Sequence, residues 1–160
     1  MNRNGFTLVE LTFVVLICVA LLALATLSFK GSSDKSAVEG QFRTMYADLM
    51  GVRSQALYRK KPRSVTFTTT GYSVYSTTNV GVSPLKQTAL KVAVTTVPSN
   101  LRIDFDQMGF ATFNNSTTST AYVCAQTMAA KAVYNSIILA QTRMQMGSLS
   151  GSGCNSAKPQ

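Results

Sequence analysis

Apolar residues follow three successive patterns along this 160-residue chain, and each pattern predicts a different kind of element. Residues 13–25 are all apolar, and the run extends over the 17 residues 11–27 if its two threonines are tolerated. A run of that length is at the lower limit for a helix that crosses ~30 Å of hydrocarbon. We therefore expect residues 6–33 to form a transmembrane helical segment.

The second pattern is a stripe of apolar residues that predicts an amphipathic helix over residues 34–61. Its members recur at alternating spacings of four and three, as the buried face of a helix requires: Val38, Phe42, Met45, Leu49, Val52 and Ala56. Charged residues lie on the opposite face, and Pro62 ends the segment. Residues 31–34 form a soft break with good N-cap residues, yet the two segments together would make one long helix.

The third pattern, strand-like alternation, covers residues 62–160 and predicts a β-rich head. Strands are expected at residues 64–68, 72–76, 90–95, 101–106, 121–126 and 134–140. The segments 77–88, 114–120 and 147–158 are rich in Ser, Thr, Asn and Gly, so loops are expected there. The predicted fold class is α+β, with a long N-terminal helix, half transmembrane and half amphipathic, packed on an antiparallel β-sheet head.

Composition narrows the possible chemistry. The chain has no histidine, which excludes Ser-His-Asp triads, Cys-His pairs and His-containing zinc sites. It carries 15 basic and 6 acidic side chains, a formal net charge of +9. Such an excess suits nucleic acid, an anionic membrane or an acidic protein, without choosing among them.

The start of the apolar run contains a carboxylate that a secretory signal peptide does not need. Glu10 stands four residues after Phe6, and charge at such a place implies a function or a partner. A cleaved signal peptide also fits poorly, because bulky Leu27, Phe29 and Lys30 follow the run. The tract Gly5-Phe6-Thr7-Leu8-Val9-Glu10-Leu11 resembles the processing and N-methylation motif of type IV pilins and pseudopilins.

That resemblance implies a role for each residue of the motif. Residues 1–5 would be a prepilin leader, cleaved between Gly5 and Phe6, and the new Phe6 amine would be methylated. Glu10 would meet the Phe6 amine of an adjacent subunit and set the register of assembly, because an unpaired charge there is strongly penalised. The formal charge would then fall to +8, since Arg3 is lost from the +9 of the full chain.

The order of elements is similar to the GspH/FimT group of minor pseudopilins and minor pilins. The similarity rests on Arg53 and Ala56 near the helix end, on Ile103-Asp104-Phe105 before Gly109, and on residues 137–143. Two features depart from related patterns. Major pilins usually carry a proline at the position where this chain has Leu27. DNA-binding members of the group carry a Gly-Arg-x-Arg tract where this chain has Thr142-Arg143-Met144-Gln145.

The resemblance implies a non-enzymatic minor pilin or pseudopilin of a type IV pilus or type II secretion pseudopilus, without cofactors. Its partners would be a prepilin peptidase, other minor and major pilins or pseudopilins, and an inner-membrane assembly platform with its ATPase. It would cross the bacterial inner membrane once, with its head in the periplasm, before extraction into a filament.

The alternative function is a FimT-like competence pilin that binds extracellular DNA through a basic head. Its candidate phosphate contacts are Arg59, Lys60, Lys61, Arg63 and Arg143. The competing interpretation is a solvated helix end with scattered surface charge.

Two pairs of residues suggest further sites. In an oxidising periplasm Cys124 and Cys154 could form a disulfide that ties the tail to the head, as in many pilins; the alternative is two free thiols. Asp104 and Asp106, two residues apart, are expected on one face of a strand. No metal site is predicted, because the sequence places no further oxygen-rich positions near them.

Overall fold

The computed structural model describes residues 7–114, 118–126, 132–149, 151 and 153–159, with the backbone alone for residues 24–30. By its internal contacts the chain divides into two units, Met1–Asp34 and Lys35–Gln160. Helix α1 spans Leu8–Arg59 and so belongs to both units. It continues without interruption through residues 31–34, where the sequence shows a soft break.

Within the first unit, the helix exposes its apolar side chains. Every large hydrophobic side chain described between residues 8 and 22 is more than half exposed, from 51% at Val14 to 80% at Leu8. Thr7 caps the helix, since its Oγ1 accepts a hydrogen bond from the Glu10 amide at 3.3 Å. In the portion that the structure describes, no helix is long and apolar enough to be a candidate membrane span.

Within the second unit, α1 supplies one side of the hydrophobic core. All six residues of the predicted stripe, from Val38 to Ala56, are at most 5% exposed. They belong to the same cluster as buried residues of both sheets. The helix ends where Lys60 adopts a left-handed backbone conformation, with a φ of 52°. The predicted amphipathic helix is confirmed, and its apolar face is the face that packs on the strands.

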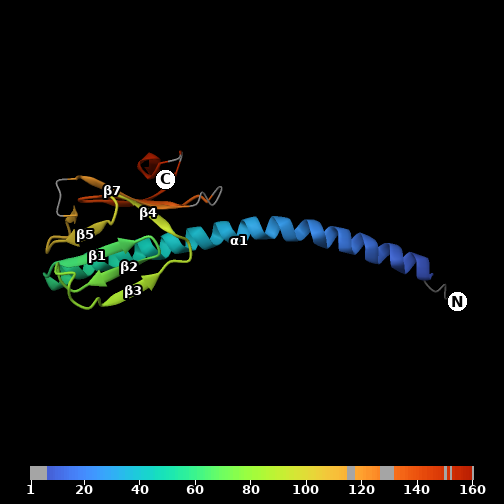
Figure 1. Ribbon diagram of the computed structural model, residues 1–160, viewed down its shortest axis with the longest axis horizontal. Coiled ribbons are helices and arrows are strands. Elements are labelled where there is room, and N and C mark those ends of the chain that lie inside the picture. The colour runs from blue at the N-terminus through green and yellow to red at the C-terminus, as the bar shows by residue number, and fades with distance from the viewer. Residues whose placement is uncertain (1–6, 115–117, 127–131, 150, 152, 160) are drawn as a thin grey trace. The chain divides into compact units, whose positions relative to one another are not determined.

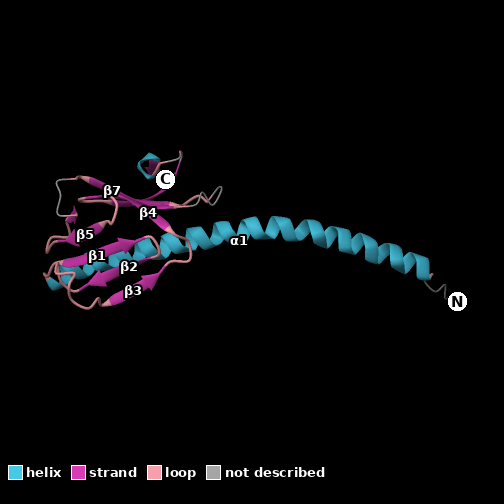
Figure 2. Ribbon diagram, in the orientation of Figure 1, coloured by secondary structure: helices cyan, strands magenta, loops and turns pink. Residues whose placement is uncertain are grey.

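The head contains two antiparallel five-stranded sheets in its described part (Figures 1 and 2). The first has the order β3-β2-β1-β5-β6 and the second the order β10-β9-β8-β7-β4. The bounds of the first sheet's strands are β1 Arg63–Thr68, β2 Gly71–Tyr75, β3 Lys86–Ala89, β5 Arg102–Phe105 and β6 Ala111–Phe113. Those of the second are β4 Val94–Val97, β7 Thr120–Ala125, β8 Ser136–Ala140, β9 Met144–Leu149 and β10 Ala157–Pro159. A long helix packed on an antiparallel head confirms the predicted α+β fold class.

The strand predicted over residues 90–95 is only partly correct, because residues 94 and 95 belong to β4 but the chain crosses from one sheet to the other at residues 90–93. Strand β3 ends at Ala89 and β4 begins at Val94. Between them, the amide and carbonyl of Val92 bond to the side chain of Gln41 on α1, at 2.9 and 2.8 Å. A helix side chain therefore satisfies backbone groups that alternation alone would assign to a neighbouring strand.

The loop predicted over residues 147–158 is also only partly correct. Strand β9 extends to Leu149, and β10 pairs with it in the register Ala157↔Leu149. A short 3₁₀ turn, Cys154–Ser156, precedes β10. The predicted disulfide between Cys124 and Cys154 is formed, with Cα atoms 5.7 Å apart. It fixes the C-terminal segment to β7, while Cys18 is a free, exposed thiol.

Candidate functional site

A basic cleft lies where α1 ends and β1 begins. Its volume is about 770 Å³, and it is lined by Arg59, by residues 61–63 and by residues 76–78. Arg59 and Lys61 are exposed at this cleft, whereas Arg63 is 5% exposed. The structure thus brings three of the predicted basic residues together around one hollow.

Arg63 departs from the expectation that the whole basic group lies at the solvated surface. Its Nε and Nη1 atoms are buried and have no hydrogen-bond partner among the described residues. Burial, reinforced by the positive charge of Arg59, lowers the pKa of the Arg63 guanidinium below its ordinary value. The signal was present in the sequence: a strand has a period of two, so Arg63 shares a face with buried Val65 and Phe67.

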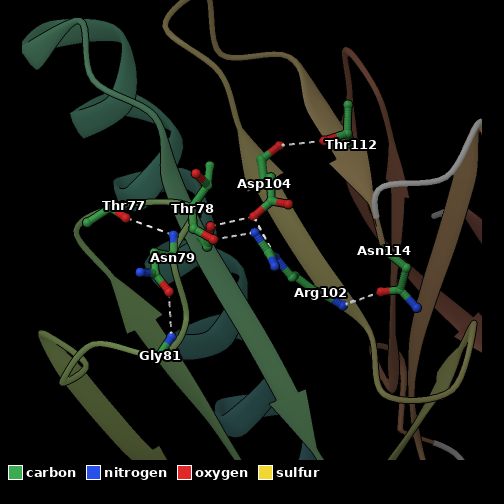
Figure 3. Close-up of polar contacts among 9 residues, drawn as sticks. Thr77, Thr78, Asn79, Gly81, Arg102, Asp104, Thr112 and Asn114 are labelled. Atoms are coloured by element: carbon green, nitrogen blue, oxygen red, sulfur yellow. Dashed lines mark hydrogen bonds and ion pairs between the residues drawn. The ribbon is translucent and has the colours of Figure 1, made fainter.

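The wall beside this cleft is held by a polar network that the sequence did not reveal (Figure 3). On β5, Arg102 Nε donates to Oδ1 of Asp104 at 2.9 Å, and its Nη2 donates to the carbonyl of Thr78. Ser64 on β1 also donates to Asp104. In the loop after β2, the Asn79 amide donates to Thr77 Oγ1 at 2.7 Å. The network therefore fixes residues 77–79 against β5.

The predicted placement of Asp104 and Asp106 on one strand face is wrong. Asp104 lies in β5, 7% exposed, and is bonded to Arg102 and Ser64. Asp106 lies beyond the end of β5, where its Oδ1 accepts the amides of Met108 and Phe110, both at 2.8 Å. The second carboxylate closes a turn, as Asx side chains commonly do. Among the described residues, no group of three or more His, Cys, Asp or Glu side chains could hold a metal ion.

The other predicted site residues lie elsewhere. Lys60 is exposed but does not line the cleft, and exposed Arg143 lies in the connection between β8 and β9. Glu10 is exposed at the third position of α1, where a carboxylate also favours the positive end of the helix dipole. Gly5 and Phe6 lie outside the described residues.

One N-terminal helix packed on an antiparallel two-sheet domain defines a type IV pilin-like fold. Two crystal forms of the minor pilin FimU from Pseudomonas aeruginosa PAO1 have similar structures. One is 17% identical, with a TM-score of 0.51, over 71% of this chain and 91% of the FimU chain. The other is also 17% identical, with a TM-score of 0.49, over 77% of this chain and 92% of FimU. No protein-family model and no curated protein sequence matches the chain.

Proposed function

We propose that this protein is a non-enzymatic minor pilin or pseudopilin of the GspH/FimT type. The observation that carries the proposal is the exposed apolar surface of residues 8–22 within the first unit. So large an apolar surface needs an apolar environment or a partner. The FimU-like fold of the chain supports the same class of protein.

The proposed mechanism begins with processing of the N-terminus. A prepilin peptidase would cut between Gly5 and Phe6 and methylate the new amine. The helix would hold the subunit in the bacterial inner membrane as a single span, with the head in the periplasm. An assembly platform and its ATPase would then move the subunit into a type IV pilus or a type II secretion pseudopilus, where apolar helices of neighbouring pilins replace lipid.

Glu10 would set the register of this assembly. Its exposed carboxylate has no ion-pair partner among the described residues. Pairing with the Phe6 amine of an adjacent subunit would neutralise both groups in the apolar filament core, where an unpaired charge is strongly destabilising.

Analysis of the protein from its native host tests the proposal. We expect a mature chain that begins with N-methylated Phe6, as read by mass spectrometry of the N-terminal peptide. Glu10→Gln should leave processing intact but lower recovery in sheared filaments about tenfold or more. Asp34→Asn, which neutralises an exposed carboxylate on the same helix, is the matched control and should assemble normally. A mature chain that begins near Ser28 would refute the pilin interpretation.

DNA binding is a second candidate function, favoured by the excess of basic side chains in the second unit. Residues 35–160 contain 13 basic and 4 acidic side chains. Burial of Arg63 removes one of the five candidate contacts, but Lys60, Lys61 and Arg143 are exposed. If these residues contact phosphates, the full chain in detergent should bind duplex DNA in a salt-dependent manner. The triple change K60A, K61A and R143A should abolish that binding.

A further inference from the structure

Arg63 is a buried cation with no ion-pair partner among the described residues. Arg63 lines the cleft and is 5% exposed as a residue, and its Nε and Nη1 meet no acceptor in the described part of the chain. A buried charge is strongly destabilising unless an opposite charge or hydrogen bonds compensate it. Compensation from outside the subunit would therefore be favourable.

The immediate surroundings of Arg63 add positive charge. Arg59 and Lys61 line the same cleft, so three cations face one hollow. The C-terminal end of α1 contributes a partial negative charge of roughly half an electron. That partial negative charge offsets only a fraction of the three positive charges. The cleft therefore remains strongly attractive to anions.

The side-chain carboxylates in the described part of the second unit are already engaged, so they supply no counter-ion. Glu39 pairs with Lys35 and accepts the Val133 amide, and Asp48 is bonded to Lys86 and Tyr72. Asp104 is bonded to Arg102 and Ser64, and Asp106 accepts two backbone amides. Asp104 pairs with Ser64 in the register of β1 and β5, so its side chain lies on the sheet face opposite to that of Arg63. It is bonded to Arg102 rather than to Arg63.

The shape of the cleft indicates how the anion would arrive. A volume of about 770 Å³ is far larger than a carboxylate or phosphate ion and is in the range of clefts that enclose a larger group. Ser76 and Thr77 add hydroxyl-bearing side chains to the lining, and Arg102 holds the neighbouring Thr78 carbonyl in place. The cleft is thus suited to an anionic side chain delivered with a short stretch of polypeptide.

We propose that this cleft is a docking site for an acidic segment of a different protein, whose carboxylate becomes the counter-ion of Arg63. A second copy of this chain is disfavoured, because it brings the same excess of positive charge. Duplex DNA is also disfavoured, since the phosphates of a rigid duplex meet cations that project from the surface, whereas a carboxylate on a flexible segment can enter the cleft where Arg63 is 5% exposed. The inference goes beyond filament assembly through the N-terminal helix, because the site lies wholly within the second unit.

Peptide binding to the full chain in non-ionic detergent tests this site. The probe is a fluorescent, end-blocked decapeptide with two adjacent glutamates among alanines and leucines, and the matched probe has glutamines instead. Fluorescence anisotropy at low ionic strength should detect binding of the glutamate peptide and no binding of the glutamine peptide. Arg59→Gln, Lys61→Gln and Arg63→Gln should each weaken binding about tenfold. Lys91→Gln, which removes an exposed cation outside the cleft, should leave the affinity unchanged.

A second measurement separates ligand binding from a structural role of Arg63. Because its charge is uncompensated in the free protein, Arg63→Met should raise Tm while it weakens peptide binding. A lower Tm for this variant would show that the fold itself compensates the charge and would overturn the proposal. So would equal binding of the two peptides, insensitivity to all three cleft variants, or saturable binding of duplex DNA or inorganic phosphate at the cleft without binding of the glutamate peptide.

Discussion

Tyr72 on β2 donates a hydrogen bond from its hydroxyl to Oδ2 of Asp48 on α1, and so ties the first sheet to the helix. Lys86, at the start of β3, forms an ion pair with the same oxygen, and its Nζ lies 2.6 Å from Oδ2. The carboxylate therefore joins three elements at one point. The helical pattern predicts only a solvated charge at position 48, but the contacts with β2 and β3 show that Asp48 lies beside the apolar stripe, next to buried Leu49.

Acid should weaken this junction. Burial alone would raise the pKa of Asp48, but hydrogen bonds from Lys86 and Tyr72 outweigh it, and the pKa lies below its ordinary value. A lowered folded-state pKa gives stability that is present above the unfolded value of about 4 and is lost as the pH falls through the folded value. Asp48→Asn should remove this pH dependence and lower the free energy of unfolding at pH 7 by about 1–3 kcal/mol. Urea denaturation from pH 7 to pH 2 measures both effects, with Asp34→Asn as the exposed control.

Alkali should weaken the same junction from the other side. Burial, and then the hydrogen bond to Asp48, raises the pKa of Tyr72 to about 12. The stability from this group is present below the unfolded pKa of about 10 and is lost as the pH rises toward 12. The loss should amount to about 2–3 kcal/mol. Tyr72→Phe should be less stable at pH 8 yet lose less between pH 10 and 12, as followed by urea denaturation; parallel curves for both proteins would contradict this explanation.

The helix and the strands β1, β2, β5, β7 and β8 were predictable because their signals are local. Spacings of four and three place Phe42 and Leu49 on one face of the helix, whatever the helix packs against. Strand alternation likewise places Val65 and Phe67 on one face of β1, and all four residues are buried. The crossing at Val92 was not predictable, because its hydrogen-bond partner, Gln41, is 51 residues away. Strand β10 was not predictable for a similar reason. The Ala157–Pro159 segment is too short to show alternation, and it forms a strand by pairing with β9.

The candidate site shows the same limit. A cluster of basic residues was visible at the helix end, and strand alternation already placed Arg63 on the face of Val65 and Phe67; only the tertiary packing shows that no partner among the described residues compensates the charge on that face. The pairing of Arg102 with Asp104 has an i,i+2 signal on one strand, although nothing local identifies the Thr78 carbonyl as the third partner. The sequence shows which charged side chains are present, but only the tertiary structure shows which of them are paired with an opposite charge.

Reduction of the Cys124–Cys154 disulfide should destabilise the head. The bond spans 30 residues and joins β7 to the turn before β10. In the chain-entropy model, opening a loop of that size costs about 3–4 kcal/mol. Denaturation with and without a reductant should show this loss, and C124S/C154S should match the reduced protein. Cys18→Ser, which alters an exposed free thiol, should leave stability unchanged in either condition.

Alanine substitutions at two glycines should change stability in opposite directions. Gly109 has a φ of +77°, and an added Cβ would lie 2.9 Å from Cγ of Leu57 on α1. Gly109→Ala thus combines left-handed backbone strain with a collision, and should cost about 1–3 kcal/mol. Gly51 lies inside α1 with no atom within 4 Å of an added Cβ, so Gly51→Ala should stabilise by roughly 0.5–1 kcal/mol through reduced backbone entropy.

Urea midpoints for the two variants, measured beside the wild type, test the pair. Leu57→Ala provides a further check, because removing the Leu57 side chain should relieve the collision while leaving the backbone strain at Gly109. The double variant L57A/G109A should therefore be more stable than the sum of the two single changes predicts. Strict additivity would assign the whole cost at Gly109 to its positive φ, since the contact with Leu57 would then contribute nothing.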